Sequence, residues 1–315
     1  MLTLKTVRQI HTAVRDDIAD LTTRRPLPGP TLERLGAFLF LNHHGPQTYS
    51  PGNNGLPFGP HPHRGFETVT FILEGALSHL DSAGHESVIG AGGVQWMTAG
   101  SGLVHSEISP DIFKRLGGPL EIIQLWVNLP ARLKMSSPRY IGLQHDSIPV
   151  ILEDAGKVVV NLISGLRNGK EGPIRSLTGV FMSTLQLRAG GRAQFNGLRG
   201  RDVFLYIVRG EVRVAGQRAT AFRLVELNAG DLLVIEGLSD AYVLFGHADP
   251  IDEPVVSHGP FVMNTKEEIR QAFADFRTGR FGSPLVIDGG RRLRTQRSNI
   301  KPPTVNYNRN PHRGP

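Results

Sequence analysis

The chain has 315 residues, of which 39% are hydrophobic, no cysteine and a formal net charge of +7. This length supports one large domain or two of ordinary size, and the missing cysteines exclude disulfides, zinc fingers and thiol nucleophiles. The charge does not predict a nucleic-acid partner, because residues 283–315 carry seven Lys or Arg against one acid, while the rest has 28 basic and 27 acidic residues. We expect this basic tail to be disordered and no nucleic acid to be recognised specifically.

No apolar run approaches the ~20 residues that span a bilayer, and the first residues lack the apolar core of a signal peptide. We therefore expect a cytoplasmic protein with no membrane partner, acting as a monomer. Glycine (37) and proline (22) are frequent, which is typical of short strands joined by turns.

The first half of the chain predicts a series of such strands. An apolar strand at 36–49 leads into a loop at 51–60 that is rich in Gly, Pro and Asn. One long strand is expected at 61–73, followed by a turn and a return strand at 76–80. Further strands follow at 87–89, 94–98, 103–108 and 120–128. This spacing predicts a sandwich or barrel rather than alternating strands and helices.

The second half repeats this pattern. Residues 72–77 resemble 207–212, and residues 89–94 resemble 227–232, which indicates a diverged internal duplication of one β-barrel unit. Its strands are expected at 181–187, 203–208, 211–214, 224–227, 232–235 and 241–245.

One helix is expected near residues 266–278. Thr265 and Glu268 fit a capping box, and the apolar residues that follow fall on one helical face. We expect that face to seal a barrel or the junction between the two barrels.

Two pairs of potential metal ligands lie in the first half. His61 and His63, and then His105 and Glu107, are each separated by one residue, so each pair shares one face of a strand. Two such strands facing each other would gather three imidazoles and one carboxylate, a ligand set for divalent iron, nickel, copper, manganese or zinc. The segments that we match to them in the second half, 196–202 and 239–243, contain no histidine, so we expect this half to bind no metal.

Glu67 is a rival for the carboxylate ligand. The parity of His61 and His63 continues through Glu67 into an apolar run, which predicts that Glu67 faces inward and that Thr68 and Thr70 face outward. As a non-ligand, Glu67 could orient an imidazole or act as a general base. Other residues are weaker candidates for a pocket beside the metal: Phe40, Phe71, Trp96, Met97, Gln124 and Trp126.

Two long motifs carry a resemblance to a known family. Residues 59–70 read Gly-Pro-His-Pro-His-Arg-Gly-Phe-Glu-Thr-Val-Thr, and residues 94–107 read Val-Gln-Trp-Met-Thr-Ala-Gly-Ser-Gly-Leu-Val-His-Ser-Glu. Together with residues 125–130 and 259–265, they resemble the pirin family of bicupin proteins, over residues 5–282.

The resemblance implies an all-β fold of two tandem cupin barrels of the jelly-roll type with a C-terminal helix. A metal-binding cupin domain is expected at 1–135 and a metal-free cupin domain at 136–282, followed by the basic tail at 283–315. The resemblance places one iron at His61, His63, His105 and Glu107, with Glu107 preferred to Glu67 as the carboxylate ligand.

Some pirins are quercetin 2,3-dioxygenases, and human pirin is a nuclear transcription cofactor whose iron oxidation state controls partner binding. The resemblance thus implies a quercetin 2,3-dioxygenase-like oxidoreductase that opens flavonols or other enolic aromatic substrates with O2. The expected metal is Fe2+, with Ni, Cu, Mn, Co or Zn as alternatives, and the expected catalytic residues are Glu67 and Glu107. The other hypotheses are an iron-dependent redox-sensing regulator that binds protein partners, and a structural cupin whose metal only stabilises the fold.

Overall fold

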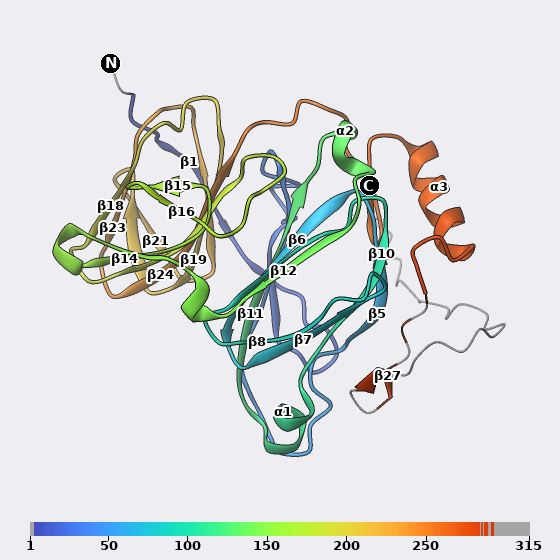
Figure 1. Ribbon diagram of the computed structural model, residues 1–315. Helices are drawn as coiled ribbons and strands as arrows, with labels where there is room; N and C mark the ends of the chain where they lie inside the picture. The colour runs from blue at the N-terminus through green and yellow to red at the C-terminus, as the bar shows by residue number, and fades with distance from the viewer. Residues whose placement is uncertain (1–2, 284, 286, 289–290, 293–315) are drawn as a thin grey trace, which may run out of the picture.

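The computed structural model describes residues 3–283, 285, 287, 288, 291 and 292. Within that part, the chain forms two β-barrels that lie side by side (Figure 1). The predicted all-β fold with two cupin barrels and a C-terminal helix is confirmed. Most of the predicted basic tail lies outside the described residues.

The first barrel consists of a large and a small antiparallel sheet. The large sheet has the order β12 (Arg139–Leu143), β9 (Val94–Thr98), β6 (Phe66–Glu74), β11 (Gly118–Asn128), β4 (Phe38–Tyr49), β3 (Thr23–Leu27) and β2 (Val14–Arg15). The small sheet has the order β5 (Phe58–His63), β10 (Leu103–Ile108), β7 (Ala76–Asp81) and β8 (Glu86–Gly90).

The second barrel has the same construction. Its large sheet has the order β1 (Val7–Thr12), β22 (Arg223–Leu227), β19 (Asp202–Arg209), β24 (Ala241–Ala248), β17 (Phe181–Leu187), β14 (Val158–Ser164) and β13 (Val150–Glu153). Its small sheet has the order β18 (Arg192–Phe195), β23 (Leu233–Gly237), β20 (Glu211–Val214) and β21 (Gln217–Thr220). The two barrels correspond strand by strand, which is the arrangement that an internal duplication produces.

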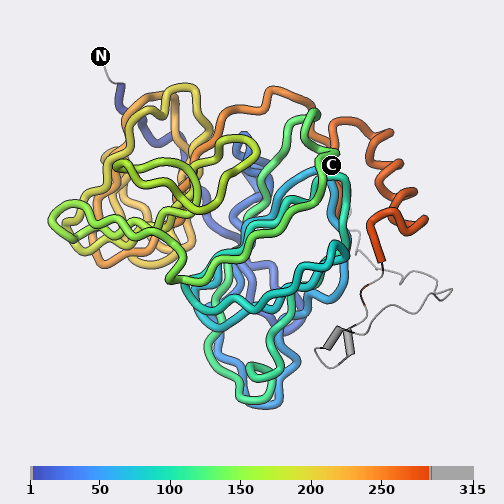
Figure 2. The backbone as a smooth tube through the Cα atoms, in the orientation of Figure 1, coloured from blue at the N-terminus to red at the C-terminus, as the bar shows by residue number. Residues whose placement is uncertain are grey.

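Strand pairing crosses the predicted boundary between residues 135 and 136 in both directions. The N-terminal strand β1 pairs with β22 of the second barrel, and β12, which follows residue 135, pairs with β9 of the first barrel. The backbone trace in Figure 2 shows the blue N-terminal segment passing into the second barrel. Each barrel therefore completes its large sheet with a strand from the other side of the boundary. The position of the boundary between residues 135 and 136 stays a prediction.

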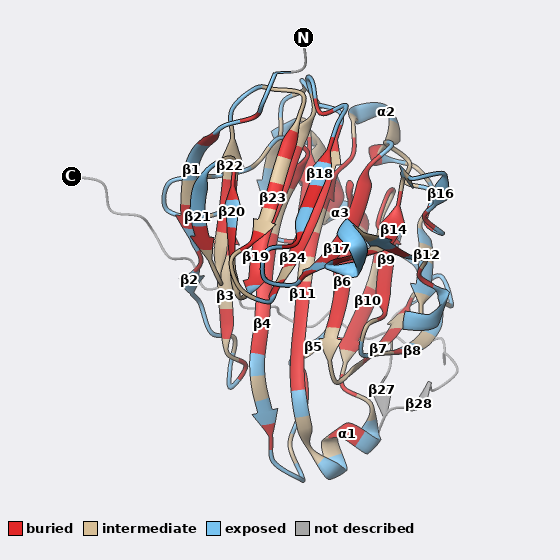
Figure 3. Cartoon of the chain, turned by 90° about the vertical axis from the view of Figure 1, so that its left-hand side faces the viewer, coloured by how far each residue is buried: buried red, intermediate tan, exposed pale blue. Residues whose placement is uncertain are grey.

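The two large sheets pack face to face and form a continuous apolar seam. Buried side chains of both barrels meet in it, and the rings of Phe38 and Phe204 lie 5.2 Å apart. Figure 3 shows buried residues along the central strands of both large sheets. Because β6 has one face on this seam and the other inside the first barrel, almost all of its residues are buried.

This arrangement overturns the predicted orientation of residues 67–73. Val69 and Phe71 belong to the seam, whereas the hydroxyl of Thr70 donates a hydrogen bond to Glu107 inside the first barrel. The expected single strand at 61–73 is two strands in different sheets, β5 and β6. The chain changes sheet at Gly65, whose φ of 88° suits glycine, so the alternation of β5 does not continue into β6.

The C-terminal segment returns to the first barrel and seals it. It contains the hairpin β25 (Val256–His258) and β26 (Phe261–Met263), followed by helix α3 (Lys266–Arg277), whose predicted capping box between Thr265 and Glu268 is present. Buried residues of α3 pack in one cluster with Val104 of β10, and Figure 1 shows α3 beside β10, away from the second barrel. The helix was expected to seal either a barrel or the junction between the barrels, and in the structure it seals the first barrel.

The remaining elements are short. They are α1 (Asp111–Leu116), α2 (Ala131–Lys134), the 3-10 turns η1 (His145–Ser147) and η2 (Asp154–Gly156), and the two-residue strands β15 (Leu166–Arg167), β16 (Lys170–Glu171), β27 (Ile287–Asp288) and β28 (Arg291–Arg292). None of the helices in the described residues is long and apolar enough to cross a membrane.

Candidate metal centre

Three imidazoles meet in the small sheet of the first barrel. His61 and His63 project from β5, and His105 projects from β10, where it pairs directly with His61. One ring nitrogen of each histidine can be chosen so that all three lie within 4.8 Å of one another. The ring centroids are 4.3 Å apart for His61 and His105 and 4.9 Å apart for His63 and His105.

The local sequence accounts for this placement. Alternation on β5 puts His61 and His63 on one face, with Pro62 between them. Proline has no N–H to donate to a sheet, and it is tolerated here because β5 is the edge strand of its sheet. The antiparallel register then sets His105 opposite His61.

Backbone carbonyls fix the orientation of two of these rings. Nδ1 of His61 lies 2.7 Å from the carbonyl oxygen of Gly59, and Nδ1 of His63 lies 3.2 Å from that of Pro260. A carbonyl oxygen only accepts hydrogen bonds, so Nδ1 carries the proton and Nε2 presents its lone pair. Carbonyl partners of this kind are common on metal-ligating histidines.

The buried ring nitrogens fit a metal. Nε2 of His63 and both ring nitrogens of His105 are buried and have no hydrogen-bond partner among the described residues. Burial, followed by the neighbouring imidazoles, lowers the pKa of His63 and of His105 well below the usual value of 6.5. Both rings are therefore neutral at physiological pH, which is the form that binds a metal. The donor set suits a divalent transition metal.

Glu107 lies two residues beyond His105 on β10 but is not one of the group of three. It is buried, and its carboxylate accepts hydrogen bonds from Thr70 Oγ1 at 3.1 Å, from Gln124 Nε2 at 2.6 Å and from Gln95. These three donors come from β6, β11 and β9 of the large sheet. They hold the carboxylate inside the first barrel, on the same face of β10 as His105.

The structure does not bring Glu67 to the imidazoles. Its carboxylate is buried on the seam side of β6, opposite to the face that carries Thr70. Oε1 accepts a hydrogen bond from the hydroxyl of Thr98 at 2.6 Å, and Oε2 has no partner among the described residues. Burial raises the pKa of Glu67 to about 6, against the opposing effect of the Thr98 hydroxyl.

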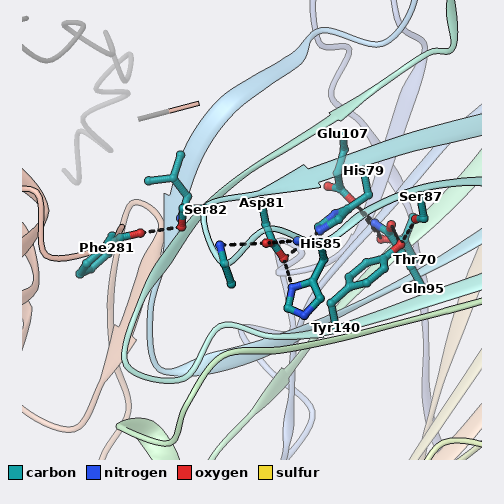
Figure 4. Close-up of polar contacts among 12 residues, drawn as sticks. Thr70, His79, Asp81, Ser82, His85, Ser87, Gln95, Glu107, Tyr140 and Phe281 are labelled. Carbon is teal, nitrogen blue, oxygen red and sulfur yellow. Dashed lines mark hydrogen bonds and ion pairs between the residues drawn. The ribbon is translucent and has the colours of Figure 1, made fainter. Parts of the chain in front are cut away.

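A polar network that the sequence pattern did not predict lies behind Glu107 (Figure 4). Tyr140 from β12 donates a hydrogen bond to Gln95 Oε1 at 3.2 Å, which turns the amide nitrogen of Gln95 toward Glu107. The ring of Tyr140 stacks on His79, with centroids 4.0 Å apart, and His79 contacts Asp81 at 3.2 Å. Gln95 and Thr70 both lie on the faces of their strands that point into the barrel. Strand alternation could therefore have predicted their contact with Glu107, but the sequence pattern assigned the wrong face of β6 to the barrel interior.

The aromatic candidates divide between two places. Trp126 lies next to the imidazoles, with its ring 5.3 Å from His63 and 4.3 Å from Phe66, and Phe40 packs 4.6 Å from Trp126. Trp96 belongs to the seam instead. Aromatic walls beside the metal centre therefore come from β4, β6 and β11.

The second barrel has no imidazole at the corresponding positions. His63 pairs with Leu103 and His61 with His105 in the first barrel, and Phe195 pairs with Leu233 and Ala193 with Ile235 in the second. Phe195, Ala193 and Ile235 therefore replace His63, His61 and His105. The equivalences expected at 196–202 and 239–243 were wrong by several residues, because the loops of the two barrels differ in length. All three replacements are apolar and buried.

Comparisons with known proteins agree with this architecture. A family model described as Pirin matches residues 20–127, and one described as Pirin C-terminal cupin domain matches residues 182–282. A pirin-like protein of Caulobacter vibrioides is 44% identical over 267 residues, which cover 84% of this chain and 94% of that protein. Human pirin is 35% identical over 267 residues, covering 82% and 87% of the two chains.

Solved structures show the same fold. A quercetin 2,3-dioxygenase from Acinetobacter baumannii superposes with a TM-score of 0.81 at 31% identity, covering 89% of this chain and 99% of that one. A bacterial pirin from Escherichia coli, solved in complex with nickel(II), superposes with a TM-score of 0.62 at 22% identity, covering 77% and 99%. The two family models together with relatives of this identity and coverage show that the chain belongs to the pirin family.

Proposed function

We propose that this protein is a metal-dependent dioxygenase that opens flavonols of the quercetin type, or other enolic aromatic compounds, with O2 at a mononuclear iron site. The main support is the group of three imidazoles, two of which keep Nε2 free through hydrogen bonds of Nδ1 to carbonyl groups. The relative from Acinetobacter baumannii that is described as a quercetin 2,3-dioxygenase supports the substrate class.

In this proposal His61, His63, His105 and Glu107 hold the metal. Fe2+ is the proposed ion, with Ni, Cu, Mn, Co or Zn as alternatives that suit the same donors. When bound, such an ion supplies Lewis acidity that favours the deprotonated form of a substrate hydroxyl, and iron also supplies redox chemistry with O2.

The chain's own residues position the carboxylate and the substrate. Thr70, Gln95 and Gln124 fix Glu107, whose carboxylate is the proposed acceptor of the substrate hydroxyl proton. We assign this role to Glu107 rather than to Glu67, because the partner of Glu67 is Thr98 on the seam side.

Access and shape also agree with a flat substrate. His61 is the only one of the three histidines that is partly exposed, so a substrate would approach from its side. The rings of Trp126, Phe40 and Phe66 provide apolar surfaces beside His63, which suit an aromatic ligand that also meets a few polar groups.

Metal analysis of the purified protein followed by an oxygen-electrode assay tests the proposal. The iron-loaded protein should consume O2 with quercetin, and His105→Ala should lower both metal affinity and oxygen uptake by at least about tenfold. His145→Ala is the matched control, because that histidine is exposed and distant from β10 in the sequence. Oxygen uptake that is absent with a panel of flavonols and catechols, at full iron loading, would contradict the proposed reaction.

A redox-sensing regulatory role is the second candidate. The supporting observation is the hydrogen bond between His63 and the carbonyl of Pro260, which connects a proposed ligand directly to the C-terminal segment that covers the first barrel. An iron held by His63 would gain one positive charge on oxidation, and this change could alter the surface that a protein partner meets. Identical partners in pull-downs with the oxidised and the reduced protein would remove this candidate.

A further inference from the structure

A cavity of about 300 Å³ lies in the second barrel, and its lining includes none of the three metal-centre histidines. Its wall combines aromatic rings, two guanidinium groups and several glycines, from Gly165, Leu166, Arg167, Gly179, Phe181, Phe195, Asn196, Gly197, Arg201 and His247. None of the described residues that line it is an aspartate or a glutamate. This volume is in the lower range of small-molecule sites in proteins.

The internal duplication shows which part of the first barrel corresponds to this cavity. Phe181 pairs with His247 across β17 and β24, as Phe40 pairs with Trp126 across β4 and β11. Phe195 holds the position of His63, as the pairing of β18 with β23 shows. The cavity therefore lies in the second barrel at the position that corresponds to the aromatic wall beside the three imidazoles.

The same register shows which residue of the second barrel stands at the position of Phe66. His247 pairs with Val203 in the second barrel, as Trp126 pairs with Thr68 in the first. Arg201 precedes Val203 by two residues, as Phe66 precedes Thr68, so Arg201 stands where the first barrel has Phe66. The cations of the cavity wall are the guanidinium groups of Arg167 and Arg201, which pair with the carboxylates of Glu153 and Asp249.

Two hydrogen-bond donors in the cavity wall have no partner among the described residues. Arg201 Nε donates to His247 Nδ1 at 2.6 Å, so the proton of the neutral imidazole is on Nε2, which can donate in turn. The ring of His247 stacks on Phe181 with an interplanar angle of 3°, which keeps the imidazole in place.

Arg167 supplies the second donor. Its Nε and Nη2 donate to the carboxylate of Glu153 at 2.7 and 2.6 Å, which holds the guanidinium over the ring of Phe195 at 4.0 Å. Nη1 has no hydrogen-bond partner in the part of the chain that the structure describes. Glu153 does not line the cavity, so it orients the guanidinium without occupying the space.

We propose that the second barrel contains a binding site for a small organic carboxylate, which accepts hydrogen bonds from Arg167 Nη1 and His247 Nε2 and places its apolar part against Leu166 and Phe181. The site would bind its ligand without a metal, through a charge-assisted hydrogen bond. It is independent of the dioxygenase proposal, because none of its residues contacts the imidazoles of the first barrel.

Calorimetric titration of benzoate into the full-length, metal-loaded protein tests this site. We expect saturable binding of one benzoate, with neutral benzamide and inorganic phosphate binding at least about tenfold more weakly. Both tryptophans, Trp96 and Trp126, lie in the first barrel, so tryptophan fluorescence should not change. Arg167→Gln and His247→Phe should each weaken binding about tenfold or more, with melting temperatures measured in parallel to show that the variants fold.

Arg192→Gln is the matched control. Arg192 lies on β18 near Phe195, its side chain is exposed, and it does not line the cavity, so its removal should leave benzoate affinity within about twofold. Absence of binding up to about 10 mM benzoate, equal binding of benzamide, or unchanged affinity in both cavity variants would overturn the proposal. Tighter binding of phosphate would replace the carboxylate by an inorganic anion, and a change in tryptophan fluorescence that persists in both cavity variants would assign the binding to the first barrel.

Discussion

Replacing Glu67 by glutamine tests how this carboxylate is placed. Burial raises its pKa from the usual 4.5 to about 6, so the folded protein binds the proton more tightly than the unfolded chain does. The stabilisation that this protonation confers is complete below pH 4.5 and is lost as the pH rises to about 6. A shift of this size corresponds to about 2 kcal/mol.

Urea denaturation of the metal-free wild type and of Glu67→Gln, at several values between pH 4 and pH 7.5, measures this effect. The glutamine cannot titrate, so the free energy of unfolding of the wild type should fall by about 2 kcal/mol relative to the variant as the pH rises through this window. A buried amide that lacks a partner lowers the variant's stability by the same amount at every pH, so it does not change the difference between the slopes.

Parallel curves for the two proteins would refute the reasoning, because they would show that Glu67 has the same pKa in both states. The variant should also bind metal as the wild type does, since the Glu67 carboxylate faces the seam beside Thr98. Loss of metal from Glu67→Gln would instead place the carboxylate at the metal centre.

Three further substitutions test the surroundings of the site. His105→Ala should lower metal affinity by at least about tenfold, measured by metal content after dialysis against a competing chelator, whereas His145→Ala should have no effect. Gln95→Leu removes a donor to Glu107 and should lower oxygen uptake about tenfold in iron-loaded protein; unchanged uptake would show that this orientation does not matter. Lys134→Met leaves three oxygen acceptors of the buried ammonium without their donor and should lower the free energy of unfolding by about 2–4 kcal/mol in a thermal melt; a melt like that of the wild type would contradict this.

The sequence by itself determined the features that depend on local alternation and on repetition. Spacing by two residues places His61 and His63 on one face of a strand wherever that strand lies, and the repeated turns at 72–77 and 207–212 indicated two copies of one barrel. The capping box between Thr265 and Glu268 is equally local, so the start of the C-terminal helix could be predicted from residues three positions apart.

Only the tertiary structure decided which face of β6 points into the first barrel. Both faces are buried, because one packs on the seam and the other on the barrel interior, so hydrophobicity does not distinguish them and the sheet change at Gly65 reverses the expected parity. For the same reason Thr70 reaches Glu107 and Glu67 does not. The contact of His63 with Pro260 joins residues separated by 197 positions, and no local pattern encodes it, because it arises only when the C-terminal segment folds back over the first barrel.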